Sequence, residues 1–175
     1  MEGKQQLEKA RERVIESIAQ NMNLYGITPS IGRLYGLLFF HDDPMTLDDM
    51  KENLGMSKTS MSTSVRSLME LKIVEKVWKK GVRKDLYTVT DDPYQTFIDL
   101  FTIKWRKGIS MNIASIERSI KELQRLTEEE TTSDEIKTLA KKDIDKLEET
   151  VSYYHWLNRL VDSFETQDIF KYIPK

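Results

Sequence analysis

Residues 46–90 constrain the fold most strongly, because three local patterns follow one another there without a break. Thr46 and Asp49 have the spacing of a capping pair that begins a short helix, and Gly55 has the character of its C-terminal stop. A second helix, rich in small polar residues, follows directly. The apolar residues then alternate as in a β-hairpin whose turn lies at Lys80-Gly81. This order predicts a winged helix-turn-helix with a two-stranded wing.

The second helix of this stretch has two very different faces. Ser57 stands where an N-cap is expected, and Met61, Val65 and Leu68 recur at the spacing of a buried helical stripe. Hydroxyl-bearing residues are poor helix formers, so something other than helix propensity selected them for the opposite face. Short polar side chains of this kind suit a helix that lies in a DNA major groove about 12 Å wide. The outward face consists of Lys58, Thr59, Ser60, Ser62, Thr63 and Arg66.

The charge of this region is opposite to that of the rest of the chain. Residues 57–87 contain eight Lys and Arg against three acidic residues, a net charge of +5, whereas the whole chain carries −2. A basic island on an acidic protein indicates a face that binds phosphates, and Arg83 in the hairpin tip is expected to grip the backbone or a narrow minor groove. The predicted DNA contacts are Ser57, Lys58, Thr59, Ser60, Ser62, Thr63, Arg66, Lys79, Lys80, Arg83 and Lys84.

Long helices are predicted on both sides of this region, so the fold class is mainly α. We expect an N-terminal dimerisation helix in residues 1–28, the DNA-binding winged helix-turn-helix in 29–92 and a helical dimerisation and effector region in 93–175. These flanking helices carry more apolar surface than one small winged domain can cover, and a two-fold operator needs two readers about 34–36 Å apart. A homodimer is therefore predicted, and an intramolecular bundle in a monomer is the alternative.

Three local features of the flanking helices can be predicted as well. Thr28 is expected to cap a helix that has Pro29 in its first position, and Thr132 with Glu135 is expected to cap the last helix. The C-terminal sequence IFKYIPK is too apolar for a free tail and is predicted to dock.

Several functional classes find no support in the chain. It has no cysteine, and no apolar run approaches the roughly 20 residues that span a bilayer. It opens without the apolar core of a signal peptide, so we expect a cytoplasmic protein. A Gly-rich phosphate loop, a nucleophile elbow and an HExxH motif are all missing, and His41 beside Asp42 and Asp43 lacks the spacing of metal ligands. The predictions are therefore no enzyme, no cofactor and no metal.

The chain resembles a known family of regulators. The order of helices, winged helix-turn-helix and long helices is similar to MarR-type repressors. Within these, NMNLYGITPSIGRLYGLLFF, PMTLDDMKENLGMSKTSMSTSVRSL and VEKVWKKGVRKDLY resemble the GbsR branch, and the likeness extends to the ending FKYIPK. This resemblance implies a homodimeric repressor of osmoprotectant genes, for choline or glycine betaine import or for choline conversion to glycine betaine. The alternative is a winged-helix scaffold whose basic face binds an acidic protein.

The resemblance also implies a quaternary ammonium effector, and aromatic cages hold such ligands by cation–π attraction. We predict that a cage would form between the second helix and the helix after the wing, although an aromatic stripe at helical spacing also fits a plain core. The candidate residues are Tyr35, Phe39, Tyr94, Phe97, Phe101 and Trp105. A weaker candidate is the run Tyr153-Tyr154-His155-Trp156, whose consecutive residues point in different directions.

Overall fold

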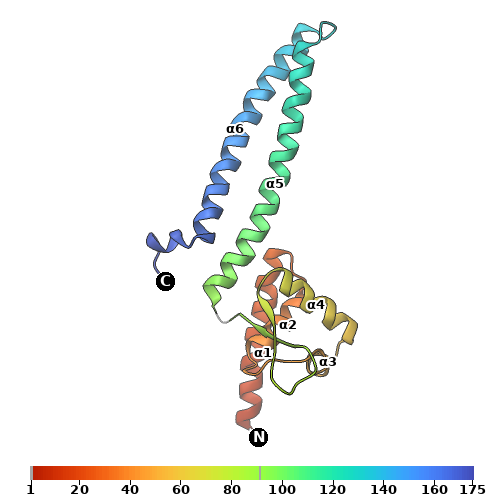
Figure 1. The fold of residues 1–175 in the computed structure, drawn as a ribbon, viewed down its shortest axis with the longest axis vertical. Helices are drawn as coiled ribbons and strands as arrows, with labels where there is room; N and C mark the ends of the chain where they lie inside the picture. The colour runs from red at the N-terminus through yellow and green to blue at the C-terminus, as the bar shows by residue number, and fades with distance from the viewer. Residues whose placement is uncertain (1, 91) are drawn as a thin grey trace. The chain divides into compact units, whose positions relative to one another are not determined.

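The computed structural model describes residues 2–90 and 92–175 and consists mainly of helices, with one two-stranded antiparallel sheet (Figure 1). The chain divides into two units, Met1–Leu100 and Phe101–Lys175. The first unit therefore holds the N-terminal helix together with the winged helix-turn-helix and the first turns of the helix that follows it. The roles assigned to the three predicted regions, in dimerisation and DNA binding, stay predictions.

Two closely packed helices begin the first unit. Helix α1 (Glu2–Met22) continues into a short 3₁₀ turn, η1 (Asn23–Tyr25), and Gly26 ends it in the left-handed region with a φ of 71°. Helix α2 (Pro29–Phe39) has Pro29 in its first turn, as predicted. The side chain of Thr28 makes no capping hydrogen bond, because its hydroxyl instead lies 3.2 Å from the hydroxyl of Ser30.

The helix-turn-helix has the predicted local structure. Thr46 and Asp49 form a reciprocal capping box at the start of α3 (Leu47–Leu54), and Gly55 ends that helix in the left-handed region with a φ of 64°. Ser57 caps α4 (Lys58–Glu70) by accepting a hydrogen bond from the Ser60 backbone N–H. The apolar stripe of α4 is buried in the core of this unit, which turns the polar residues of the helix outward.

The wing consists of β1 (Val74–Val77) and β2 (Leu86–Val89), which pair antiparallel with Val74 opposite Val89. Met45 makes an isolated bridge to Tyr87, with two backbone hydrogen bonds of 2.9 Å that tie the loop before α3 to the base of the wing. The connecting segment is residues 78–85, hereafter the wing loop, and Gly81 at its tip has a φ of 85°. The loop is longer than the tight hairpin predicted, and Trp78 lies in it rather than in the strand.

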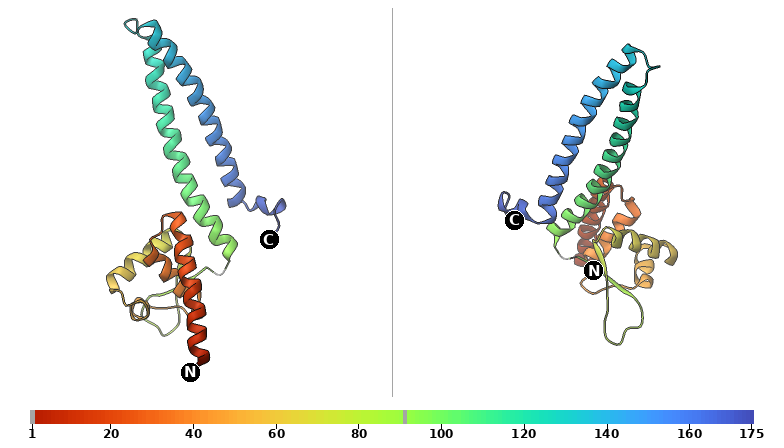
Figure 2. Two further views of the ribbon diagram at one scale, coloured as in Figure 1. Left: turned by 180° about the vertical axis from the view of Figure 1, so that it is seen from behind. Right: turned by 45° about the horizontal axis from the view of Figure 1, so that its top comes forward.

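A helical hairpin makes up most of the second unit. Helices α5 (Pro93–Glu128) and α6 (Asp134–Glu165) run antiparallel side by side, and a 3₁₀ turn, η2 (Asp168–Lys171), follows α6 (Figure 2). The buried core of the hairpin is Ile109, Leu157 and Val161, against which Phe101 and Tyr154 pack. Among the described residues, no helix combines the length and apolar character that crossing a membrane requires.

Two predictions for the second unit are wrong. The N-cap of α6 is Ser133, whose hydroxyl accepts a hydrogen bond from the Ile136 N–H; Thr132 lies one residue too early for that bond. The prediction that the C-terminal segment docks is wrong for Tyr172 and Ile173, which are 84% and 66% exposed, whereas Ile169 and Phe170 before them are half-buried.

Candidate nucleic-acid interface and aromatic pocket

Helix α4 separates its side chains by function. Met61, Val65 and Leu68 are buried, and Ser64 is buried beside them. The other face carries the predicted contacts, of which Ser60 and Ser62 are half-buried while Lys58, Thr59, Thr63 and Arg66 are exposed. The helix can therefore present two cations and several hydroxyls to a partner without losing its anchorage in the core.

The hydroxyls on α4 are not equivalent. The Ser57 side chain accepts a hydrogen bond from the Ser60 N–H at 3.1 Å, and the two hydroxyls lie 2.9 Å apart. Ser57 and Ser60 therefore serve the helix end itself. Within the described part of the chain, no hydrogen bond is made by the hydroxyls of Thr59, Ser62 or Thr63, so these three are available to bases or phosphates.

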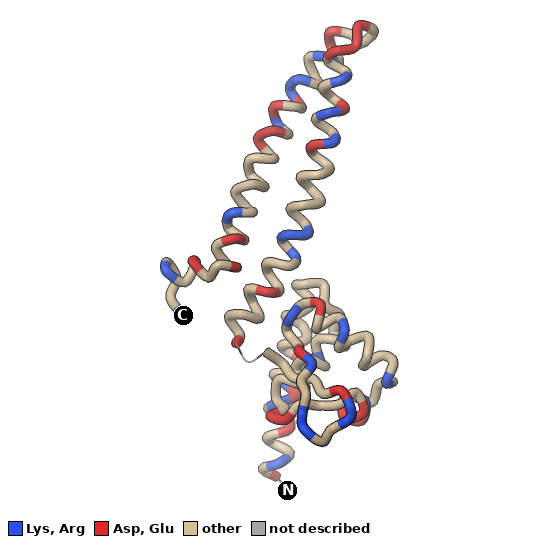
Figure 3. The backbone as a smooth tube through the Cα atoms, in the orientation of Figure 1, with Lys and Arg blue, Asp and Glu red and all other residues tan. Residues whose placement is uncertain are grey.

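The cations of the wing also fall into two groups. Three lysines pair with carboxylates: Lys76 Nζ lies 2.8 Å from Asp85, Lys79 Nζ 3.6 Å from Asp43 and Lys84 Nζ 2.9 Å from Asp48. In the described ranges, no carboxylate pairs with Lys80 or Arg83, and both are exposed in the wing loop, which Figure 3 colours blue along much of its length. These two side chains are the wing cations most accessible to phosphate.

One carboxylate joins the recognition helix to the wing. Asp48, in the first turn of α3, binds Lys58 through Oδ1 and Lys84 through Oδ2, each at 2.9 Å. The hydrogen bond from Lys58, followed by the one from Lys84, lowers the pKa of Asp48 to about 2. Two of the predicted DNA contacts are therefore already engaged within the protein.

The wing loop also exposes a large aromatic side chain that the sequence reasoning missed as a functional residue. Trp78 is 81% exposed and lines a hollow of about 560 Å³ together with Val82 and Arg83. An exposed tryptophan beside cations can pack on a sugar or a base while the charges hold phosphates. Val74, Val77 and Trp78 together have the apolar character of a strand, so sequence reasoning counts Trp78 with the first strand of the wing and assigns it no function.

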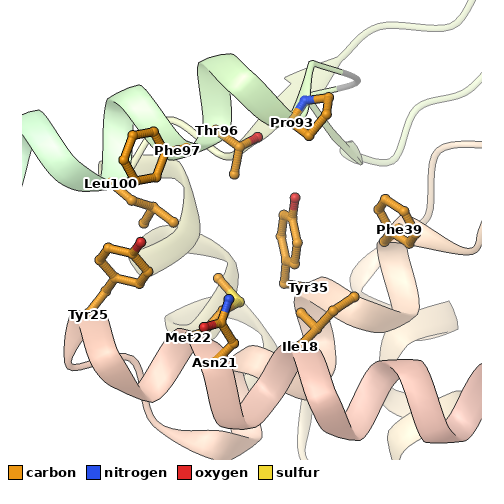
Figure 4. A pocket seen from close by; sticks show the side chains of 10 residues that line it. All are labelled: Ile18, Asn21, Met22, Tyr25, Tyr35, Phe39, Pro93, Thr96, Phe97 and Leu100. Atoms are coloured by element: carbon orange, nitrogen blue, oxygen red, sulfur yellow. The ribbon is translucent and has the colours of Figure 1, made fainter. Parts of the chain in front are cut away.

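A pocket of about 270 Å³ lies within the first unit, between α1, α2 and the first turns of α5. Tyr35 reaches up from α2 toward Thr96 and Pro93 of α5, and Tyr25 closes one side (Figure 4). Burial raises the pKa of the Tyr35 hydroxyl, and the nearby Thr96 hydroxyl offsets part of that rise. Among the described residues Thr96 Oγ1 is buried without a well-aligned hydrogen-bond partner. The lining residues are Ile18, Asn21, Met22, Tyr25, Tyr35, Phe39, Pro93, Thr96, Phe97 and Leu100.

The pocket collects only part of the predicted aromatic set. Tyr35, Phe39 and Phe97 line it, whereas Tyr94, Phe101 and Trp105 do not. Phe101 belongs to the second unit, where its ring lies 4.8 Å from that of Phe164. In the weaker candidate cluster, the rings of Tyr153 and Trp156 stack at 6.3 Å on the surface of α6, and both side chains are half exposed.

Residues 93–171 match the model of the C-terminal helical hairpin of GbsR-family transcriptional regulators. Over 169 residues the chain is 44% identical to the putative HTH-type transcriptional regulator YvaV of Bacillus subtilis, covering 97% of this chain and 95% of that protein. It is 43% identical over 168 residues to the HTH-type transcriptional repressor GbsR of the same organism, covering 96% and 93%. This chain belongs to the GbsR family of transcriptional regulators.

Two further similarities concern the sequence and the fold. The HTH-type transcriptional repressor OpcR of Bacillus subtilis is 41% identical over 169 residues, covering 97% of this chain and 91% of that protein. The crystal structure of a transcriptional regulator shares the fold with a TM-score of 0.57 at 14% identity, covering 90% of this chain and 99% of that one. The GbsR-family chain is a DNA-binding transcriptional regulator and not an enzyme.

The remaining polar residues in the described part of this GbsR-family chain show no metal-binding arrangement. His41 follows the end of α2, and its Nδ1 lies 3.1 Å from the backbone oxygen of Asp43. In residues 2–90 and 92–175, no three His, Cys, Asp or Glu side chains gather in the way that a metal site requires.

Proposed function

We propose that this GbsR-family regulator is a homodimeric repressor of genes for osmoprotectant uptake or glycine betaine synthesis. We further propose that it works in the cytoplasm and responds to choline or a related quaternary ammonium compound. The cationic and hydroxyl-rich face formed by α4 and the wing carries the DNA-binding part. Its relatives GbsR and OpcR are named as repressors, which supports repression rather than activation. The family resemblance supports the target genes.

In this proposal α4 lies in the major groove and the wing follows the adjacent backbone. Thr59, Thr63 and Arg66 are exposed on the outer face of α4. Short side chains there can reach base edges, and an arginine can donate two hydrogen bonds to one guanine. Lys80 and Arg83 are the wing cations without a carboxylate partner among the described residues. They are therefore assigned to phosphates or to the minor groove.

The second unit supports the homodimer. Its helices of 36 and 32 residues bury a core of only a few side chains, near Ile109 and Leu157. Apolar patches left in water are typical of surfaces that bind another protein. A second copy would cover them and would place a second α4 at the other half of a two-fold operator. The exposed apolar residues of the hairpin include Met111, Leu126, Ile136, Leu139, Tyr153 and Trp156.

Gel shifts with the DNA upstream of the chain's own gene test the DNA-binding proposal against random duplex of equal length. Arg83→Ala should weaken binding by about 1–3 kcal/mol if it reads bases and should reduce the slope of log K against log salt by about 1 if it binds phosphate. Lys142→Ala is the matched control, because it removes one exposed cation from α6. Equal affinity of the wild-type protein for both duplexes would refute the repressor proposal.

The pocket in the first unit is the proposed effector site. Four aromatic rings line it, and none of its lining residues carries a charge, so a cation inside it would be held by ring faces rather than by a carboxylate. Its volume of about 270 Å³ lies just below the usual range of ligand pockets, roughly 300 to 1,000 Å³. Both properties fit a small quaternary ammonium compound better than a large drug-like ligand.

Calorimetric titration with choline, glycine betaine and 3,3-dimethylbutanol tests this assignment. The last compound is the uncharged isostere of choline, so a cation–π site worth about 1–2 kcal/mol should bind it roughly tenfold more weakly than choline. Phe97→Ala should weaken choline binding, whereas Trp105→Ala should not, because Trp105 does not line the pocket. Equal binding of choline and its uncharged isostere, or binding of none of the three compounds, would contradict the proposal.

A further inference from the structure

Asp48 stands where the three DNA-facing elements of the first unit meet. It lies in the first turn of α3, whereas Lys58 begins α4 and Lys84 lies in the wing loop just before β2. Each ammonium group is 2.9 Å from a different oxygen of the same carboxylate. A side chain of the first helix of the motif thus links the recognition helix to the wing.

The helix that carries Asp48 is firmly held. Met50 of α3 is fully buried, and the capping box of Thr46 and Asp49 fixes the turn in which Asp48 lies. Met45 is hydrogen-bonded to Tyr87 at the base of the wing. The carboxylate therefore acts from a rigid position on two side chains that would otherwise be free to turn.

The two ion pairs have opposite consequences for two kinds of DNA. On random duplex, binding depends on phosphate neutralisation, and each lysine that reaches a phosphate steepens the salt dependence by about 0.9. Asp48 opposes this, because one carboxylate cancels one of the two positive charges and offers each lysine a partner inside the protein. On a cognate site, α4 and the wing must engage together, and a fixed relation between them lowers the ordering cost of binding.

We infer that Asp48 is a specificity-determining residue of the DNA-binding face. Its carboxylate withholds Lys58 and Lys84 from non-specific phosphate contacts and holds the wing in register with α4 for the cognate site. The inference rests on the proposed role of α4 and the wing in DNA binding. The inference predicts how strongly the protein prefers its cognate site over random duplex, and not whether it binds DNA at all.

Asp48→Asn tests the inference because the side chain keeps its shape and loses its charge. Anisotropy titrations at several KCl concentrations would compare a duplex that the wild-type protein selects from a random pool with a scrambled duplex. The variant should bind the scrambled duplex about 2–30-fold more tightly, which is the range expected when two exposed ion pairs no longer compete for the lysines. Its salt slope should be steeper by about 1–2. Its preference for the selected duplex should fall.

Two further variants separate the inference from simpler causes. Asp42→Asn removes the same charge from a nearby exposed residue that pairs with no cation in the described part of the chain. It should preserve the preference. Adding Lys58→Gln and Lys84→Gln to Asp48→Asn should abolish the gain in affinity for the scrambled duplex. This triple variant keeps the test valid if thermal melts show that Asp48→Asn is less stable than the wild type.

The outcomes distinguish the inference from the proposed function. If the wild-type protein selects no sequence from the pool, the proposed function itself fails. If the wild-type protein discriminates and Asp48→Asn discriminates equally well, only the inference is overturned. It is also overturned if Asp42→Asn reproduces the effect, or if Asp48→Asn weakens binding to both duplexes by the same factor.

Discussion

Replacing Gly32 with alanine should destabilise the first unit, because Gly32 marks the closest approach of α1 and α2. A Cβ atom at this position would lie 2.7 Å from Ala19 Cα and 3.2 Å from the Ala19 backbone oxygen. Both are main-chain atoms, so no side-chain rotation can relieve the contact. The two helices would have to separate by about 0.8 Å to reach the lower end of normal carbon–carbon contact.

The size of the effect follows from two opposing terms. Overpacking of a core costs about 1–3 kcal/mol, whereas glycine to alanine inside a helix gains about 1 kcal/mol in helix propensity. The net loss expected for Gly32→Ala is therefore up to about 2 kcal/mol, which corresponds to a fall in Tm of up to about 8 °C for a chain of this size. The pocket between α1 and α2 should bind choline less well in the same variant, since its walls are displaced.

Gly108→Ala provides the matched control in helix α5. A Cβ there meets no atom within 4 Å, so the same chemical change should stabilise the protein by about 0.5–1 kcal/mol. Urea unfolding followed by circular dichroism measures both variants against the wild type. If Gly32→Ala is as stable as Gly108→Ala, helices α1 and α2 do not approach as closely as the structure shows and the reasoning is refuted.

Further predictions concern single side chains. Thr96→Val should leave the free energy of unfolding unchanged or raise it by about 1–2 kcal/mol in urea titrations, because it removes a buried hydroxyl without an aligned partner among the described residues. Ser133→Ala should lower the free energy of unfolding by about 1 kcal/mol and Thr132→Ala by less than about 0.5, as only the former caps α6. Arg106→Ala should cost about 1–2 kcal/mol in the same assay, since the guanidinium binds Asn158, Asp162 and Glu165 of α6 but is 36% exposed. Folding lowers the pKa of Asp48. Its ion pairs therefore contribute to folding stability at pH values above the usual aspartate pKa of about 3.9, and this contribution is lost as the pH falls toward about 2. Carboxyl ¹³C shifts should therefore titrate with a midpoint of about 2, and a midpoint near 4 would show that the lysines are not paired.

The helix-turn-helix was predictable because its signals are local. A capping box requires only the spacing of Thr46 and Asp49, and a left-handed C-cap requires only a glycine at position 55. The same signals fail where neighbours are chemically alike. In the segment Thr131-Thr132-Ser133 any of the three hydroxyls can cap a helix, and the choice of Ser133 depends on where α5 ends and the chain turns back.

The pocket and the ion pairs were harder to predict because they depend on packing between elements. Aromatic residues of α2 and α5 were expected to face each other, but α1 supplies three further lining residues and the 3₁₀ turn after it supplies Tyr25, and no helical spacing relates these to the others. Spacing also placed Phe97 and Phe101 on one face of α5, although Phe101 packs against Phe164. Asp48 and Lys84 are 36 residues apart, and their contact arises only when the wing folds back over α3.

Helix α2 is the element through which a ligand in the pocket would act on the DNA-binding face. Tyr35 and Phe39 line the pocket, while Leu34 and Leu38 are buried in the core and the helix packs against both α4 and β2. The close contact at Gly32 ties α2 to α1, so these two helices would move together relative to the first turns of α5. An effector that binds one such arrangement more tightly than another would shift the equilibrium between the corresponding positions of α4. The shift equals the difference in binding free energy, typically about 1–3 kcal/mol between coupled sites. In the proposed mechanism the same displacement would reach the wing, because β2 leads into α5 within a few residues, and α4 and the wing would respond to one ligand together.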